Sequence, residues 1–358
     1  MFSFGSALPK TSASTSVTPN ASNEARPRSR ARRNLLAAVG ATALAASLAT
    51  GLAASTAATA TAATAPTAPA GSYVLAGGPF AGRALYVDPH STAAAAAAGG
   101  TSTVLNRLAA IPQATWLAGG TPAQAAGIVR TEVTAAAPSG SVTEFVVYDL
   151  PNRDCSGGQS AGGASATTAY QTYVSAVSSA LNGARGIVVL EPDALADLGC
   201  LDASGQAARL ALLKWAVQRL VQPGVQVYLD AGHSGWQTSA TMASRLIKAG
   251  IYYARGFALN VSGFDPTSSE IVYGTKISSQ VGWKPFVVDT SRNGSATAGG
   301  WCNPAGATTG ALPGTDTGTA AADALLWIKH PGESDGTCGT STTTAGGLDA
   351  GLATALAG

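Results

Sequence analysis

A short apolar run that ends at two carboxylates limits the possible fold of this chain more than any other feature. Residues 187–190 (Ile-Val-Val-Leu) are continuous, apolar and mostly β-branched, which is typical of a strand buried on both faces in a parallel sheet. The run stops at Glu191-Pro192-Asp193, because proline cannot continue a central strand. Catalytic groups of barrel and open α/β folds lie just beyond the carboxyl ends of strands. The stretch therefore predicts a parallel α/β fold with acidic side chains at its functional edge.

Two further stretches repeat this design. Residues 145–148 run into Asp149 and Asp154, and residues 225–229 run into Asp230. Aspartate and proline also begin ordinary loops, so a single acidic strand end carries little information. Three acidic strand ends in one chain indicate a site assembled from several strands.

The order of strand-like and helix-like segments predicts one α/β domain with a barrel-like sheet. Seven segments have strand character: 115–117, 145–148, 187–190, 225–229, 257–261, 285–288 and 325–329. Amphipathic stretches between them have helical spacing, clearest at 168–181, 206–221 and 238–249. Repeated strand–helix units over residues 71–358 indicate a single barrel domain with seven strands, one fewer than a complete barrel.

The first 54 residues have the organisation of an export signal. A basic cluster at residues 28–33 precedes an apolar run that starts at Leu35, and small-residue triplets suited to cleavage follow. The Arg32-Arg33 pair also permits twin-arginine export. An uncleaved membrane anchor is the alternative, because the run is long enough to span a bilayer, but its Ala/Gly-rich composition favours cleavage. Residues 55–70 form an Ala/Thr/Pro linker, so we expect a secreted protein without a stable membrane partner.

The distribution of charge excludes a nucleic-acid partner. The chain of 358 residues has 21 basic and 19 acidic residues, but six of the basic residues and only one acid lie in the first 70. The remainder is mildly acidic and has no basic stripe of the kind that binds phosphate backbones.

All four cysteines follow the leader and the linker. None forms a CxxC pair, and the chain has only three histidines, which argues against a zinc site. Behind an export signal, two disulfides are expected instead. The sequence by itself leaves all three pairings open.

The predicted strand ends supply carboxylates and amides, with the aromatic residues Tyr86, Trp236, Trp301 and Trp327 beside them. The motif at residues 232–236 (GHSGW) resembles a nucleophile elbow only superficially, because no glycine stands two residues after the serine. Carboxylates beside aromatic platforms suit glycoside cleavage, in which one acid protonates the leaving oxygen and another carboxylate activates water or attacks carbon. A third carboxylate raises the pKa of the acid by repulsion. Asp154 is expected to do this for Asp193, because the two follow neighbouring strands.

Taken together, these segments resemble glycoside hydrolase family 6, the cellulases that cleave β-1,4-glucan. The matching motifs occur in the family's order: VYDLPNRDC at 147–155, EPDALA at 191–196, YLDAGHSGW at 228–236, GFALNV at 256–261, DTSRNG at 289–294, WCNP at 301–304 and KHPGESDG at 329–336. They extend through almost all of residues 71–340, and seven motifs in register make the resemblance specific. It implies a distorted, incomplete β/α barrel that inverts the anomeric centre without a metal or cofactor.

The resemblance also implies a role for individual residues. Asp193 corresponds to the general acid, Asp154 to the carboxylate that tunes it and helps to handle the attacking water, and Asp335 to the residue proposed as the base, directly or through a water chain. Ten residues are expected to bind the sugar chain: Tyr86, Tyr148, Ser160, Asp230, His233, Trp236, Asn260, Trp301, Lys329 and Glu333. In this set Tyr148 corresponds to the tyrosine that distorts the sugar, and the two tryptophans to stacking platforms.

The expected disulfides, on the same resemblance, are Cys155–Cys200 and Cys302–Cys338. Long loops roof the groove in chain-end members of the family, whereas the connections 155–170 and 301–325 contain no long insertions here. An open groove and internal cutting follow, so the first hypothesis is a secreted, monomeric endo-β-1,4-glucanase. A cellobiohydrolase is the first alternative. A non-catalytic glucan-binding protein is the second, which the presence of all three catalytic carboxylates disfavours.

Overall fold

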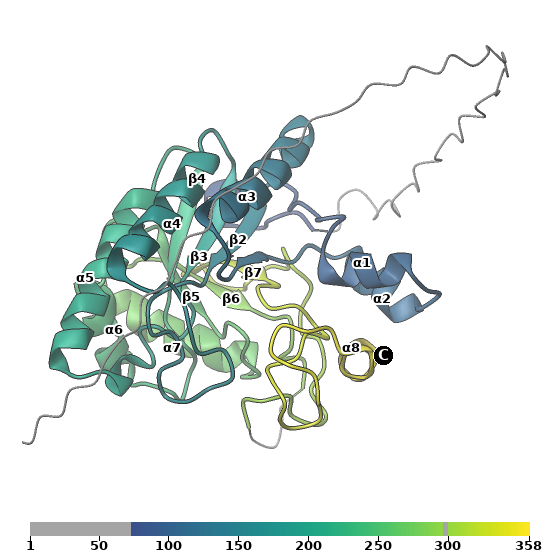
Figure 1. Ribbon diagram of the computed structural model, residues 1–358. Coiled ribbons are helices and arrows are strands. Elements are labelled where there is room, and N and C mark those ends of the chain that lie inside the picture. Colours follow the sequence, from purple (N-terminus) through teal and green to yellow (C-terminus); the bar gives the residue numbers. More distant parts are fainter. Residues whose placement is uncertain (1–72, 296–299) are drawn as a thin grey trace, which may run out of the picture. The chain divides into compact units, whose positions relative to one another are not determined.

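The computed structural model describes residues 73–295 and 300–358, so the predicted export signal (1–54) and linker (55–70) lie outside the described residues. Seven parallel strands form one sheet in sequence order, curled into an open, distorted half-barrel (Figure 1). They are β1 (Thr115–Leu117), β2 (Thr143–Val147), β3 (Gly186–Leu190), β4 (Val225–Asp230), β5 (Gly256–Leu259), β6 (Phe286–Asp289) and β7 (Ala322–Leu326). The predicted α/β fold with seven strands is confirmed.

Side chains along each strand alternate between two buried clusters. In β3, Val188 and Leu190 belong to the cluster that the surrounding helices share, whereas Ile187 and Val189 belong to the cluster inside the curved sheet. All five residues of β3 are buried. Both faces of the strand are therefore apolar, which is why the run is continuous rather than alternating.

Helices cover the outer face of the sheet, as Figure 1 shows for α3 to α7. The helices are α1 (Thr92–Ala98), α2 (Thr103–Ala109), α3 (Pro122–Ala136), α4 (Thr167–Ala180), α5 (Ala203–Leu220), α6 (Ser239–Lys248), α7 (Thr267–Gln280) and α8 (Ala350–Ala357). Their starts have clear local causes. Thr121 and Gln124 form a capping box at α3, and the side chains of Asp202 and Thr238 cap α5 and α6. No helix in the described ranges is both long enough and apolar enough to span a bilayer.

The barrel is incomplete between β1 and β7. No strand ladder joins these two edges within the described part of the chain. Instead, the Ala114 amide donates to the carbonyl of Trp327 (3.0 Å), and the Trp116 indole donates to the carbonyl of Ile328 (2.8 Å). We call this gap between β1 and β7 the seam; these isolated contacts hold it rather than a ladder. Leu85 forms a parallel bridge with Val142, next to the start of β2.

The last strand departs from its prediction. It was expected at 325–329 but spans Ala322–Leu326, because its first half consists of small side chains that look like a loop in the sequence. Trp327 also departs from prediction. Its side chain is only 2% exposed, packs among helices α1, α2 and α8, and donates its indole N–H to the carbonyl of Ala311 (2.9 Å). Trp327 is therefore part of the core and offers no platform for a ligand.

One interior carboxyl group makes stability depend on pH. Glu144 of β2 is buried, its side-chain oxygens have no hydrogen-bond partner, and burial, reinforced by Asp289, raises its pKa to about 8. The unfolded chain ionises this group near pH 4.5, so its contribution to stability is lost as the pH rises from about 4.5 to about 8. The free energy of unfolding should therefore fall between pH 5 and pH 8, and we expect Glu144→Gln to reduce this fall by on the order of a few kcal/mol. Urea unfolding at pH 5 and pH 8 measures the free energy at both values.

Asp316→Asn offers a matched control for Glu144→Gln, because it removes an exposed carboxyl group instead of a buried one. If the free energy of unfolding depended on pH equally in wild type and Glu144→Gln, the assignment would be contradicted. Part of this pH dependence should persist in Glu144→Gln, because burial also raises the pKa values of Glu132 and Glu191 to about 8.

Candidate active site

Asp193 lies at the centre of a group of carboxylates beyond the carboxyl end of β3. Its backbone amide donates to Oδ1 of Asp230, the last residue of β4 (2.9 Å). Burial raises the pKa of Asp193 well above its usual range, and the carboxylates of Asp230, Asp154, Asp197 and Asp335 raise it further. The predicted clustering of acidic strand ends is thus present in the structure. A carboxyl group kept protonated in this way can donate a proton at neutral pH.

The loop after β2 brings Asp154 and Ser160 together. Oδ2 of Asp154 accepts a hydrogen bond from the Ser160 amide (2.6 Å), and Nε of Arg153 donates to the Ser160 carbonyl (2.9 Å). The Arg153 guanidinium also lies 4.6 Å from the centre of the Tyr148 ring and donates to the Tyr148 carbonyl. Burial and the nearby carboxylates of Asp193 and Asp154 raise the pKa of Tyr148, so its phenol stays protonated.

Asp335, on the loop after β7, is held by a cation. Nη1 of Arg292 donates to both carboxylate oxygens of Asp335 (2.9 Å each), and the Asn303 amide donates to Oδ2 (3.1 Å). The Arg292 side chain is almost fully buried, so the charge of Asp335 has a partner that is itself shielded from water. The carboxylate has a fixed orientation as a result.

Lys329 and Glu333 form a second polar group on the same side of the sheet. The Lys329 ammonium lies 3.7 Å from Oε2 of Glu333 and 5.3 Å from the centre of the Trp116 ring. Burial alone would raise the pKa of Glu333, but His330, Lys329 and Thr92 outweigh it and lower the value to about 2. Glu333 is therefore ionised throughout the range in which the protein would work.

The sequence interpretation missed Trp116 as a site residue. It lies in β1, where it looks like an ordinary strand residue, yet its ring meets Tyr148 edge-on at 5.5 Å and faces the Lys329 ammonium. Only the folded sheet brings β1 next to the loop after β7. The predicted aromatic Tyr86 is half-buried, and its pKa is raised by burial and by Asp88 and Glu132.

Two residues predicted to bind sugar lie beneath the site instead. Asn260 is fully buried, and its side-chain amide is engaged by the Asp265 amide and by the carbonyls of Asp265 and Asp289. Asp230 is buried and accepts from the amides of Asp193 and Gly232. The structure therefore makes both residues supports of the backbone. The side-chain amide of Asn260 and Oδ1 of Asp230 are already used by the chain itself, whereas Oδ2 of Asp230 is buried without a hydrogen-bond partner among the described residues.

The two carboxylates that follow β3 also differ in whether they support the backbone or face the site. Glu191 precedes Asp193 by two residues, yet it is buried and accepts hydrogen bonds from the amides of Asp149 and Leu150 on the neighbouring loop. Asp193 itself is only half-buried. Of the two carboxylates after β3, one therefore fixes the loop that carries Asp154, and the other faces the site.

Comparisons with known proteins agree with this geometry. The sequence profile described as "Glycosyl hydrolases family 6" matches residues 80–358. The chain belongs to glycosyl hydrolase family 6.

Two relatives carry endoglucanase names. Endoglucanase A of Cellulomonas fimi is 42% identical over 257 residues, which are 71% of this chain and 56% of that protein. The family 6 chain thus spans little more than half of that relative's length. The structure of the endoglucanase Cel6 from Mycobacterium tuberculosis, in complex with methyl-cellobiosyl-4-deoxy-4-thio-β-D-cellobioside, matches with a TM-score of 0.75 and 42% identity, and the match covers 78% of this chain and 98% of that one.

A more distant relative carries a different name. The catalytic core of the cellobiohydrolase Cel6A from Chaetomium thermophilum matches with a TM-score of 0.68 and 26% identity, covering 78% of this chain and 98% of that one.

Backbone strain is concentrated at the site of this family 6 chain. Eight residues other than glycine have a positive φ in the described ranges, and six of them follow β2, β3 or β5: Asn152, Asp154, Glu191, Asp193, Asn260 and Ser262. Such conformations cost free energy and persist where the surroundings enforce them. For two of them the enforcement is visible, because the amides of Asp193 and Ser262 donate to the buried carboxylates of Asp230 and Asp289.

Both expected disulfides are present. Cys155–Cys200 joins the loop that carries Asp154 to the segment after β3, and Cys302–Cys338 joins the loop after β6 to the loop after β7 that carries Asp335. The pairing implied by the family resemblance is confirmed. Each disulfide thereby fixes a loop that carries an acidic residue of the site.

Trp236 and Trp301 are open to solvent. Their exposed fractions are 38% and 59%, and the ring of Trp236 lies 5.2 Å from that of His233. Nδ1 of His233 is 2.9 Å from Oδ2 of Asp265, which orients the imidazole. Both predicted platforms are therefore accessible to a ligand.

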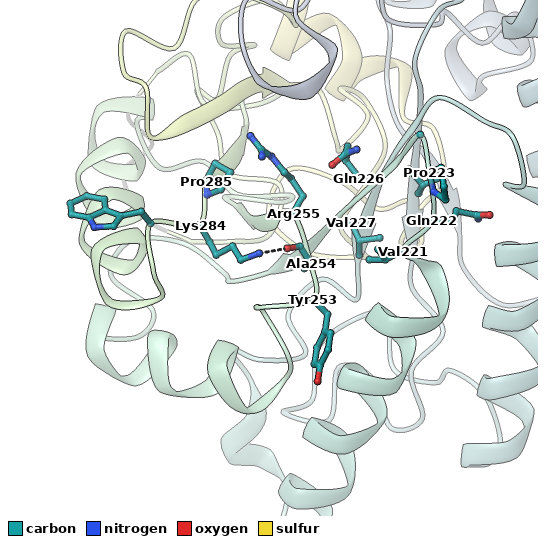
Figure 2. Close-up of a pocket in the computed structure, with 13 residues that line it drawn as sticks. Val221, Gln222, Pro223, Gln226, Val227, Tyr253, Ala254, Arg255, Lys284 and Pro285 are labelled. Atoms are coloured by element: carbon teal, nitrogen blue, oxygen red, sulfur yellow. Dashed lines mark hydrogen bonds between the residues drawn. The ribbon is translucent and has the colours of Figure 1, made fainter.

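A pocket elsewhere on the domain is unrelated to these groups. It has a volume of about 490 Å³ and is lined by the amino-terminal ends of β4 and β6 and by residues 253–255, including Tyr253, Arg255 and Lys284 (Figure 2). The carboxylates around Asp193 follow the opposite ends of the strands. Nothing in this lining provides a pair of carboxylates for glycoside cleavage.

Proposed function

We propose that this family 6 chain is a secreted endo-β-1,4-glucanase that hydrolyses internal bonds of a β-1,4-glucan with inversion at the anomeric carbon. The observation that carries the proposal is the grouping of carboxylates around Asp193, whose amide donates to Asp230; burial and the charges of these neighbours raise the pKa of Asp193. Glycoside hydrolysis needs one carboxyl group that stays protonated and another that activates water. The cluster meets the first requirement by burial and repulsion, without an added group.

In the proposed mechanism, Asp193 protonates the leaving oxygen and the charge of Asp154 keeps Asp193 protonated until it does so. The hydrogen bond between Asp154 and the Ser160 amide supports a second task for Asp154, which is to orient the loop that meets the attacking water. Asp335 is the proposed base. Because Arg292 engages both of its oxygens, we favour proton removal through a water over direct abstraction.

The proposed substrate contacts divide into stacking and polar groups. Trp236 and Trp301 would stack on sugar rings, since both have exposed faces. Lys329 and Glu333 would hydrogen-bond sugar hydroxyls, and Tyr148 would press on the ring at the cleavage point. The cello-oligosaccharide analogue bound by the Mycobacterium tuberculosis enzyme supports a β-1,4-glucan as the class of substrate.

Internal cutting is supported by two observations. The indoles of Trp236 and Trp301 have exposed fractions of 38% and 59%, and endoglucanases at 42% identity are nearer relatives than the cellobiohydrolase at 26%. A cellobiohydrolase remains the second candidate, since members of both kinds share the fold. The two differ in where they cut a long chain.

We expect the viscosity of a soluble β-1,4-glucan to fall steeply while few reducing ends have appeared, because each internal cut shortens a long chain. Viscometry and a reducing-sugar assay on the same samples measure this. Reducing ends that accumulate with little loss of viscosity would assign the enzyme to chain ends. Proton NMR of cello-oligosaccharide cleavage tests the stereochemistry: the α-anomer should appear first, and the β-anomer appearing first would overturn the roles given to the carboxylates.

Export through residues 1–54 is part of the proposal. Its test is the amino-terminal sequence of protein recovered from the culture medium. A start after the apolar run supports a cleaved signal, whereas an intact amino terminus in the membrane fraction would support the anchor.

A further inference from the structure

The carboxylate of Asp289, at the end of β6, accepts hydrogen bonds from four backbone amides. Oδ1 accepts from Ser291 (2.9 Å) and Ile328 (3.2 Å), and Oδ2 accepts from Ser262 (3.1 Å) and Lys329 (2.9 Å). The residue is buried, and none of the ion pairs in the described ranges includes it. Its acceptor capacity is thus spent on the chain itself.

These four amides belong to segments that follow three different strands. Ser262 follows β5, Ser291 follows β6, and Ile328 and Lys329 follow β7. The backbone carbonyl of Asp289 also accepts from the side chain of Asn260 (3.0 Å). One side chain therefore sets the relative positions of three loops.

Two of those loops carry groups of the proposed mechanism. The amide of Lys329 is a direct partner of Asp289, and the ammonium of Lys329 reaches Glu333 and Trp116. Ser291 directly precedes Arg292, whose guanidinium holds Asp335 and also donates to the carbonyl of Ser262. A shift of the Asp289 carboxylate would therefore move both the Lys329 group and the Arg292–Asp335 pair.

We propose that Asp289 is the positioning residue for the half of the site formed after β5, β6 and β7. It touches no substrate and acts through Lys329 and through the Arg292–Asp335 pair. The inference rests on the proposed function for its kinetic consequence but on the hydrogen bonds alone for its structural one.

Asp289→Asn is the sharpest change. The amide group keeps the shape of the carboxylate but turns one acceptor oxygen into a donor, so two of the four backbone N–H groups lose their acceptor. We expect kcat/KM for cello-oligosaccharides to fall by about 10–100-fold, because displacements of about 1 Å have effects of this size. If the substitution acts mainly through Asp335, the loss should appear in kcat. If it acts mainly through Lys329, the loss should appear in KM.

Asp323→Asn is the matched control. Asp323 is a buried acid in the neighbouring strand β7 that accepts from the Tyr228 hydroxyl (2.8 Å) and pairs with Arg255 (2.9 Å). Arg255 lies at the pocket of Figure 2, away from the catalytic carboxylates. This variant should lose stability as Asp289→Asn does, yet keep kcat/KM at a temperature where both are folded. Equal kinetic losses in the two variants would reduce Asp289 to a structural role and overturn the proposal.

A double-mutant cycle with Asp335→Asn separates positioning from general damage. If Asp289 acts through Asp335, Asp289→Asn should lower kcat/KM by a several-fold smaller factor in the Asp335→Asn variant than in the wild type. The cycle with Lys329→Met is read in the same way. Fully additive losses in both cycles would contradict the proposal.

A crystal structure of Asp289→Asn keeps the test independent of the reaction. Displacement of the Lys329 and Arg292 side chains is expected. Unchanged positions would overturn the inference even in an active enzyme. If wild type hydrolyses no β-glucan while these displacements are seen, the proposed function fails and the positioning role stands.

Discussion

Asp193→Asn and Asp193→Ala are expected to lower kcat on cello-oligosaccharides by about 10²–10⁴-fold, the usual contribution of a general acid. Asparagine is the better matched substitution, because Asp193 has a φ of 70° and asparagine tolerates this left-handed conformation whereas alanine does not. Folding should survive in the asparagine variant, since a neutral amide replaces a carboxyl group that its surroundings keep protonated. Steady-state kinetics and urea unfolding of the same preparation measure both effects.

The dependence of activity on pH should also identify Asp193 as the acid. Asp193 must be protonated to act, and burial with four neighbouring carboxylates raises its pKa, so activity should persist to higher pH than an ordinary aspartate would allow and then fall. Exposed Asp202, which caps α5, provides the control, because Asp202→Asn should leave both turnover and the pH profile unchanged. Near-wild-type turnover in either Asp193 variant would refute the role of this residue as the acid.

Reduction of the two disulfides is expected to produce the largest loss of stability. They close loops with sequence separations of 45 and 36 residues, and a disulfide over loops of this size contributes about 2–4 kcal/mol in the usual estimate. All four cysteines are paired, so a reductant acts on these two bonds alone. Urea unfolding with and without dithiothreitol should show a lower midpoint after reduction.

The double variants Cys155→Ser/Cys200→Ser and Cys302→Ser/Cys338→Ser apportion the loss between the two bonds. The first should also lower kcat, because it frees the loop that carries Asp154, and the second should disturb Asp335. Four thiols that react with Ellman's reagent in the folded, secreted protein would show that neither bond forms in solution.

The central strands could be predicted from the sequence because burial on both faces leaves an unbroken apolar run. β3 illustrates this, since its apolar core of residues 187–190 was predicted and only Gly186 was missed. β7 could not be placed as well, because Ala322 and Ala324 fit a crowded interior but have no side chain that distinguishes them from a loop. Local composition reports burial only where the buried side chain is large.

The site was predictable in location but not in orientation. Glu191 and Asp193 stand two residues apart on the same strand end, yet one turns beneath the loop of Asp149 while the other faces the site. That choice depends on backbone angles and on acceptors needed by neighbouring loops, which no local pattern encodes. The buried Asn260 and the missed Trp116 have the same cause, because their surroundings come from segments far away in the chain.

The seam between β1 and β7 has a practical consequence for protein engineering. Trp327, which accepts the Ala114 amide across the seam through its carbonyl, packs in the same cluster as Tyr73 and as Ala353 and Ala357 of α8. A variant cut to residues 73–358 would therefore have neighbouring ends, and such chains can be rejoined by a short linker and reopened at an exposed loop with little loss of core contacts. That variant is suited to circular permutation, and the new linker would add a covalent connection beside the isolated contacts that hold the seam.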